Sequence, residues 1–170
     1  MITQEQYLES IQHEINVCKH LYTKITDAML NYRPTPGQRS TLELLQYLSG
    51  CGIVPIRGIL SGDWPGVHAA IEKTKELRVQ DFCAAMDRQM QEIREVIRGI
   101  PEADFAAREV VMPTGQKSRL GPALLNYPFK FLAAYRMQLF LYIKANGRAE
   151  LSTYNCWMGI DKPTDQPSPH

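Results

Sequence analysis

Residues 120–147, LGPALLNYPFKFLAAYRMQLFLYIKANG, form the longest run of apolar residues with helical spacing in the chain. Winding this run at about 3.6 residues per turn places a mostly aromatic set of side chains on one side: Leu124, Tyr127, Phe131, Tyr135, Gln138 and Tyr142. Asn126, Lys130 and Lys144 lie on the opposite side. The pattern predicts a long helix that faces the core and ends at Gly147, a residue type that favours the C-terminal end of helices.

The first helix is predicted to begin at residues 3–6, TQEQ, a capping-box sequence in which side chains and backbone amides bond reciprocally. Apolar residues then recur at helical spacing from Tyr7 to Met29. Residues 33–37, RPTPG, contain two prolines that disfavour helix in the residues before them, so the helix is expected to end near Tyr32. His13 and His20 fall on its polar face, which predicts solvated surface histidines.

A second capping box, Ser40 with Glu43, predicts the start of the next helix. We expect this helix to continue to Leu60 with a kink at Pro55, because proline removes a backbone donor. Residues 67–79 have a mixed composition and are expected to form a loop with one helical turn or more.

The third helix is predicted to begin at Asp81, a suitable capping residue, and to end at Pro101. Its buried stripe is expected to contain Phe82, Met86, Met90, Ile93, Ile97 and Ile100.

Residues 109–117 combine a short β-like run with a glycine turn, which predicts a hairpin or an extended segment before the last helix. After Gly147, residues 152–160, which contain Trp157, are expected to pack back onto the bundle as an ordered tail.

Composition favours one domain over residues 1–160, followed by a proline-rich flexible tail over residues 161–170. The formal net charge is only +1 and no long basic cluster occurs, so a nucleic-acid partner is not expected. Charged residues interrupt the best apolar run, so a membrane span is not expected either. Four widely spaced cysteines and no visible targeting signal predict reduced thiols in a cytoplasmic protein.

Four phrases of the sequence resemble the DinB/YfiT-like four-helix bundle superfamily. They are RPTPGQRSTLELLQYLSG from Arg33, RGIL from Arg57, YRMQLFLYIKANG from Tyr135 and TYNCWMGID from Thr153. The resemblance implies an all-α four-helix bundle with up-down-down-up topology, one long crossover and a short extended segment or hairpin before the last helix. It also implies a homodimer.

In metal-binding members of that family, the second helix supplies one histidine ligand, and the last helix supplies two at i and i+4. Matched by motif, the corresponding positions here are Tyr47, Phe131 and Tyr135. Neither phenylalanine nor a neutral phenol is a good ligand for a divalent metal ion. The sequence therefore predicts that the metal site is lost, with no other cofactor and no catalytic residue in its place.

The ligand places could instead form part of a small-molecule pocket or simply pack as core aromatics. The candidates for lining such a pocket are Tyr47, Cys51, Tyr127, Phe131, Tyr135, Arg136 and Gln138. Cys51 is expected to be a core thiol, because no neighbouring base would activate it. Arg136 is expected either to form a structural salt bridge or to bind an anionic group.

Three functions remain open on the sequence. The leading one is a metal-free small-molecule-binding or stress-associated protein with a degenerate active site. The alternatives are a metal- or thiol-dependent transferase or hydrolase of the DinB/YfiT type, and a structural dimerisation module.

Overall fold

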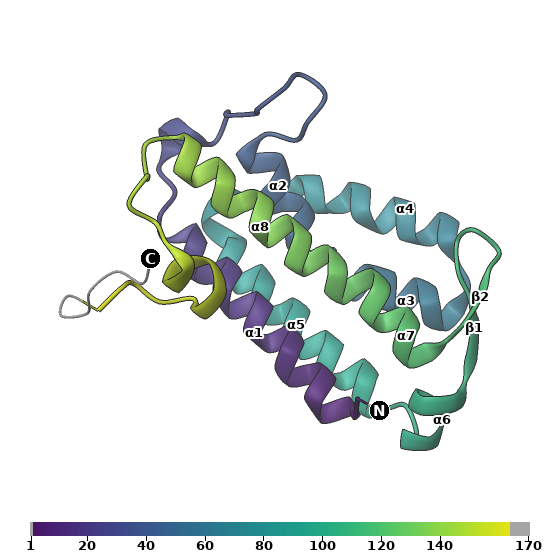
Figure 1. Cartoon of the computed structure of the whole chain (residues 1–170). Helices are drawn as coiled ribbons and strands as arrows, with labels where there is room; N and C mark the ends of the chain where they lie inside the picture. Colours follow the sequence, from purple (N-terminus) through teal and green to yellow (C-terminus); the bar gives the residue numbers. More distant parts are fainter. Residues whose placement is uncertain (1, 164–170) are drawn as a thin grey trace.

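A computed structural model describes residues 2–163, and four long helical segments build its core (Figure 1). They are α1 (Gln4–Tyr22), the broken pair α2 (Thr41–Leu48) and α3 (Ile53–Ser61), α5 (Phe82–Arg98), and the pair α7 (Leu120–Leu124) and α8 (Lys130–Ala145). α1 packs against α5 and α8, α2 packs against α8, and α3 packs against α5. The all-α bundle expected from the sequence is confirmed, while its up-down-down-up order stays a prediction.

α1 begins as predicted but is shorter. Both halves of the Thr3 capping box are present, which confirms the predicted start. The helix ends at Tyr22 rather than near Tyr32, so the predicted end is wrong. After a 3₁₀ turn (Asp27–Met29), the carbonyl of Tyr32 accepts a hydrogen bond from the Thr41 amide at 2.9 Å. This hydrogen bond closes the loop between the segment and the start of α2, an effect that helical periodicity does not reveal.

The second helix is broken before Pro55, not kinked at it. α2 starts at the predicted Ser40 capping box and stops at Leu48, and α3 starts at Ile53 with an axis bent by 47°. Buried Gln89 of α5 bonds to the backbone exposed by the break, accepting from the Gly52 amide at 2.8 Å and donating to the Leu48 carbonyl at 3.0 Å. The break is therefore stabilised by a side chain about 40 residues away, which the sequence does not indicate.

Residues 67–79 were expected to form a loop, yet most of them are helical. α4 (Trp64–Lys73) is followed by two 3₁₀ turns (Thr74–Glu76 and Val79–Asp81). Asp63 caps α4 by accepting a hydrogen bond from the Gly66 amide at 2.9 Å, and Pro65 lies in the first turn, where no amide donor is needed. The 3₁₀ turn places Asp81 before α5, but its side chain does not cap that helix.

The predicted stripe of α5 is confirmed, since all six of its residues are buried. A short helix that the sequence did not predict, α6 (Glu102–Ala107), follows. The hairpin before the last helix is also confirmed: β1 (Glu109–Val111) pairs antiparallel with β2 (Lys117–Arg119), and Gly115 turns the chain with a φ of 80°.

The last helix is continuous, but its buried face differs from the predicted one. Pro128 cannot donate to the Leu124 carbonyl, and residues 125–129 form a π turn between α7 and α8. Tyr7 of α1 donates its hydroxyl to that carbonyl at 3.5 Å. The π turn shifts the following residues by one position, or about 100° around the axis. The face is therefore completed by Leu132, Arg136, Leu139 and Ile143, while Tyr127, Phe131, Tyr135 and Gln138 are half-buried.

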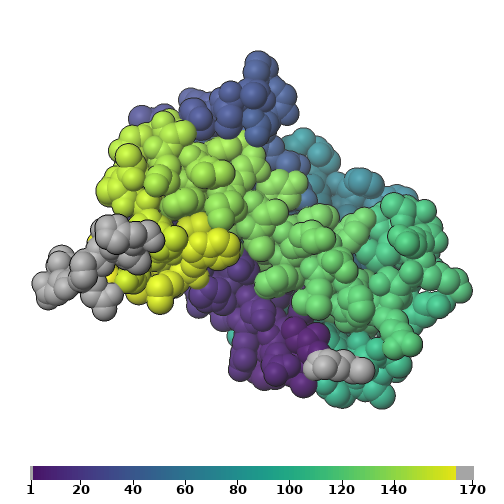
Figure 2. Space-filling view, in the orientation of Figure 1, coloured from purple at the N-terminus to yellow at the C-terminus, as the bar shows by residue number. Residues whose placement is uncertain are grey.

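The C-terminal segment packs back on the bundle as expected, around a π turn (Tyr154–Met158). In Figure 2 it fills the space between α1 and the end of α8. Cys156 is buried in this segment, whereas Trp157 is 53% exposed. His20 is half-buried, and its Nε2 lies within hydrogen-bond distance of the Asn155 side-chain nitrogen, at 3.1 Å. The predicted solvated position of His20 is therefore wrong. His13 is exposed, as predicted.

The predicted domain boundary at residue 160 stays a prediction. Asp161, directly after it, pairs with Lys24 at 2.7 Å and accepts from Asn155 at 2.9 Å. Residues 164–170 of the predicted flexible tail lie outside the described residues.

All four cysteines are free thiols. Within residues 2–163 no single helix is long and apolar enough to cross a membrane, and α2 with α3 meets that test only as a bent pair.

Candidate ligand-binding site

The capping box of α2 sets the direction of Tyr47. The Ser40 hydroxyl accepts from the Glu43 amide at 3.2 Å, and the Ser40 amide donates to the Glu43 carboxylate at 2.7 Å. This second bond is the main cause that holds the pKa of Glu43 below its usual value. With the start of the helix fixed, Leu44 and Leu48 enter the core and Tyr47 points toward α8, half-buried.

Tyr47 is one of five half-buried rings that form a row along α8, which we call the aromatic row. The Tyr47 and Tyr135 ring centroids lie 4.7 Å apart with an edge-on geometry. Phe131 lies 6.4 Å from Tyr135, Tyr127 lies 5.2 Å from Phe131, and Trp64 of α4 lies 6.3 Å from Tyr127. The three positions that correspond to metal ligands in the resembling family therefore do converge, as aromatic rings.

Arg39 covers the outer end of the aromatic row. Its guanidinium carbon lies 4.1 Å from the Tyr47 ring centroid and 5.5 Å from that of Tyr135, both within cation–π range. The backbone of Arg39 is held from α8, because Tyr142 donates its hydroxyl to the Arg39 carbonyl at 3.1 Å. Gln138 in turn donates to that hydroxyl at 2.5 Å. α8 thus holds the backbone of Arg39, while α2 and α8 together provide the rings beneath its guanidinium.

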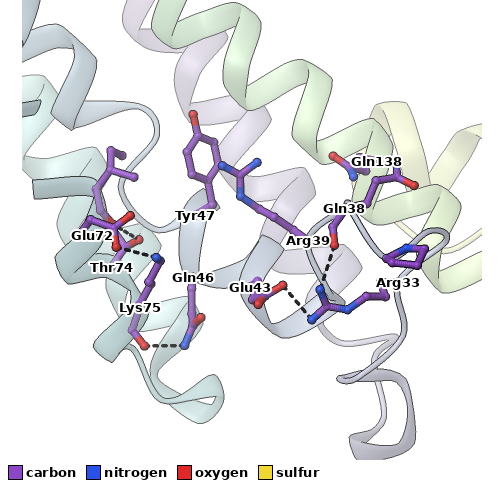
Figure 3. A pocket seen from close by; sticks show the side chains of 13 residues that line it. Arg33, Gln38, Arg39, Glu43, Gln46, Tyr47, Glu72, Thr74, Lys75 and Gln138 are labelled. Carbon is purple, nitrogen blue, oxygen red and sulfur yellow. Dashed lines mark hydrogen bonds and ion pairs between the residues drawn. The ribbon is translucent and has the colours of Figure 1, made fainter. Parts of the chain in front are cut away.

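A cleft of about 670 Å³ opens beside Arg39 and Tyr47 (Figure 3). One wall is the loop before α2 together with Gln138 of α8, the floor is α2, and the other wall is the end of α4 with the turn after it. The lining residues are Arg33, Pro36, Gly37, Gln38, Arg39, Glu43, Gln46, Tyr47, Ile71, Glu72, Thr74, Lys75 and Gln138. The volume lies within the range of small-molecule sites.

Most charges of the cleft neutralise each other. Arg33 pairs with Glu43 at 3.2 Å, and Lys75 pairs with Glu72 at 2.5 Å. Arg39 has neither an acidic partner nor a hydrogen-bond acceptor for its guanidinium among residues 2–163. One positive charge in the cleft is therefore free to meet a ligand.

Tyr47 is held as a neutral phenol. Burial is the largest cause that raises its pKa above the ordinary tyrosine value, and the nearby Cys51 and Tyr135 groups add to it. Arg39 acts in the opposite direction and lowers this pKa, because its charge favours a phenolate. Tyr47 therefore acts as a hydrogen-bonding ring rather than as a base at neutral pH.

Cys51 lies one turn from Tyr47 but is fully buried. Burial raises the pKa of its thiol well above the usual range, and the Arg39 charge offsets this only partly. A neutral, enclosed thiol is neither a nucleophile nor a surface that a ligand can touch. Cys51 is a buried core thiol, as the sequence predicted, and it does not line the cleft.

Arg136 lies on the other side of α8, away from the cleft. It is 2% exposed, and its Nε donates to Glu14 of α1 at 2.7 Å. Its Nη1 donates to the Cys156 carbonyl at 2.6 Å. Both partners belong to the protein, so the salt-bridge alternative predicted from the sequence is the one that the geometry supports.

The donor set does not fit a metal ion. Among the residues described, no three His, Cys, Asp or Glu side chains come together in a way that could hold one. Tyr47, Phe131 and Tyr135 offer two phenols and a hydrocarbon ring, and the raised pKa of Tyr47 keeps its oxygen protonated.

Of the seven pocket candidates, only Tyr47 and Gln138 line the cleft, while Tyr127, Phe131 and Tyr135 lie along the aromatic row. Sequence reasoning missed Arg39, which stands in a proline-rich loop directly before a capping box. Its position suggested only a loop residue. Its side chain contacts Tyr135, almost a hundred residues later in the sequence, and no local pattern signals that contact.

The broken helix pairs and the hairpin before the last helix define an all-α fold. The structure is similar to the crystal structure of a DinB-like protein, YjoA, from Bacillus subtilis. The TM-score is 0.65 and the identity is 18%, over 88% of this chain and 97% of that one. No protein-family model and no curated protein sequence matches the chain. The similarity confirms the DinB-like fold inferred from the sequence, and it concerns the fold alone.

Proposed function

We propose that the protein binds a small organic molecule, without a metal ion, in the cleft beside Arg39 and Tyr47. The observation that carries this proposal is the free Arg39 guanidinium, which lies on the Tyr47 ring at the edge of a 670 Å³ cleft. A fixed charge, an aromatic surface and several side-chain amides in one concave site are typical of small-molecule recognition.

The degenerate metal site is part of the same proposal. The aromatic row replaces the three histidines that the resembling family would place there, and Arg39 brings a cation of the chain itself to its outer end.

A ligand screen in the presence of a chelator tests the proposal. Compounds that raise the melting temperature should shift the backbone NMR signals of residues 38–47 and of Gln138. Tyr47→Ala should abolish these shifts, whereas Trp157→Ala, which truncates a 53% exposed ring outside the cleft, should leave them unchanged. Binding that persists in Tyr47→Ala, or that requires added zinc or nickel, would contradict the proposal.

The thiol-dependent alternative has no support from Cys51, since its burial raises the pKa and hides the sulfur. Homodimerisation and a cytoplasmic location remain proposals that rest on the sequence. The exposed apolar side chains of Leu141, Trp157 and Met158 are compatible with a dimer surface and therefore also with a dimerisation module. Light scattering on the purified chain measures the oligomeric state directly.

A further inference from the structure

We infer that the ligand of the cleft is an organic monoanion, specifically a carboxylate that pairs with the Arg39 guanidinium. This inference rests on the proposed function and names the chemical class of its ligand. The planar fork of arginine matches the two oxygens of a carboxylate, and such charge-assisted pairs are stronger than neutral hydrogen bonds.

The orientation of Arg39 is the first argument. The ring of Tyr47 covers one face of the guanidinium at 4.1 Å, so the plane is held while the N–H donors at its edge keep no acceptor in the described chain. Figure 3 shows this side chain crossing the cleft from the loop to Tyr47. Arg39 is exposed, and a guanidinium that stacks on a ring in this way has fewer conformations to lose when its N–H groups bind an acceptor.

The charge balance of the cleft is the second argument, and it favours a single negative charge. The three cations Arg33, Arg39 and Lys75 face the two carboxylates of Glu43 and Glu72. Two of the cations are already paired, which leaves one positive charge unmatched. A phosphate dianion would place its second charge near those carboxylates without a second free cation, and a cationic ligand would meet Arg39 directly.

The remaining surface indicates an organic body rather than an inorganic ion. The Tyr47 ring and Ile71 provide apolar contact in the cleft. Gln46 donates its amide group to the carbonyls of Lys75 and Leu77, at 2.7 and 3.2 Å, which leaves its side-chain oxygen as an acceptor. Gln138 likewise donates its amide group to the Tyr142 hydroxyl, which leaves its side-chain oxygen as an acceptor. A carboxylate ligand with its own N–H or O–H group would therefore satisfy both ends of the cleft.

A matched series of probes tests this inference: 2-naphthoate, its neutral amide, naphthyl phosphate and naphthyl-trimethylammonium. Binding is followed by NMR titration of the full chain. We expect naphthoate to bind in the cleft and the amide to bind about 10- to 100-fold more weakly, as the loss of a charge-assisted hydrogen bond requires. Arg39→Gln should weaken naphthoate binding by about 10- to 100-fold and should weaken amide binding by a smaller factor, because the amide loses only a hydrogen bond to a neutral acceptor.

Arg57→Gln is the matched control, because it removes one positive charge from a residue that pairs with Glu92 and does not line the cleft. It should retain naphthoate binding. Tighter binding of the phosphate or of the ammonium probe, or equal loss in Arg57→Gln, would overturn the inference. If the amide or the ammonium probe binds in a Tyr47-dependent way while naphthoate does not, the carboxylate inference fails and the proposed function stands. If neither the probes nor the wider screen bind, the proposed function fails as well.

Discussion

Arg136 and Glu14 form a buried ion pair that joins the last helix to the first. Their Nε and carboxylate oxygen lie 2.7 Å apart, and the two side chains are 3% and 10% exposed. Arg136 also donates to the Cys156 carbonyl at 2.6 Å, so the same guanidinium anchors the C-terminal segment. One side chain therefore holds together three parts of the chain.

Glu14→Gln should lower the free energy of unfolding by about 3–5 kcal/mol, because it leaves the Arg136 charge buried without its counter-ion. Urea unfolding followed by circular dichroism measures this change. Glu92 pairs with Arg57 at the surface, where its side chain is 42% exposed, and Glu92→Gln is the control that should cost about 0–1 kcal/mol. Equal losses for the two variants would show that the buried pair has no special role.

Gln89 should contribute as much to the free energy of unfolding as an apolar core residue of its size. Gln89→Leu keeps the volume but leaves the Gly52 and Ile53 amides without their side-chain acceptor and removes the stronger donor to the Leu48 carbonyl, which keeps only a long contact with the Cys51 thiol at 3.8 Å. We expect a loss of about 2–4 kcal/mol, since each unsatisfied buried group costs about 1–3 kcal/mol. Denaturant unfolding measures the loss, and hydrogen exchange at the two amides should become faster.

Gln91→Leu, on the exposed side of the same helix, provides the comparison. It should change the free energy of unfolding by less than about 0.5 kcal/mol. If Gln89→Leu were equally mild, water or a backbone shift would have to replace the Gln89 hydrogen bonds, and the account of the α2–α3 break would be wrong.

Stability should fall at alkaline pH because of the buried thiols. Burial raises the pKa of Cys18 and Cys51 above their ordinary value of 9.0. Above about pH 9 the unfolded chain releases these protons while the folded chain retains them, so the stabilisation is full below that pH and declines as pH rises. The slope is up to about 1.4 kcal/mol per pH unit for each thiol. Urea unfolding under reducing conditions at about pH 8 and pH 10 measures it.

Cys51→Ala should make this alkaline slope shallower by up to the contribution of one proton. The comparison uses the difference between the two pH values, so the cost of the smaller side chain cancels. A slope that is unchanged in Cys51→Ala would mean that Cys51 ionises in the folded protein.

The Tyr142 hydroxyl should matter for both stability and binding, since it links Gln138 to the Arg39 carbonyl. Tyr142→Phe should lower the free energy of unfolding by about 1 kcal/mol and weaken naphthoate binding several-fold. Tyr32→Phe is the control, because that ring packs edge-on against Tyr142 at 5.5 Å without a hydrogen bond to Arg39. Loss of stability with no change in binding would show that Arg39 is positioned by other contacts.

Sequence alone determined the features that depend on neighbouring residues. The capping boxes at Thr3 and Ser40, the buried stripe of α5 and the glycine turn of the hairpin are short-range patterns, and all of them are present. The resemblance of four sequence phrases to the DinB/YfiT-like superfamily was also sufficient to predict the fold, and the structural similarity to YjoA confirms that prediction. Local hydrogen bonding and helical periodicity carry this information within a few residues.

Tertiary structure alone decided the features that depend on distant residues. Gln89 stabilises the break between α2 and α3, and the Tyr32 carbonyl bonds to the Thr41 amide beyond the shortened α1. The π turn at Pro128 rotated the last helix and changed which of its residues are buried. Arg39 became the centre of the candidate site only because packing of α8 against α2 brings Tyr47 and Tyr135 beneath its guanidinium. A contact across almost a hundred residues depends on how whole helices pack, and no window of the sequence contains both of its partners.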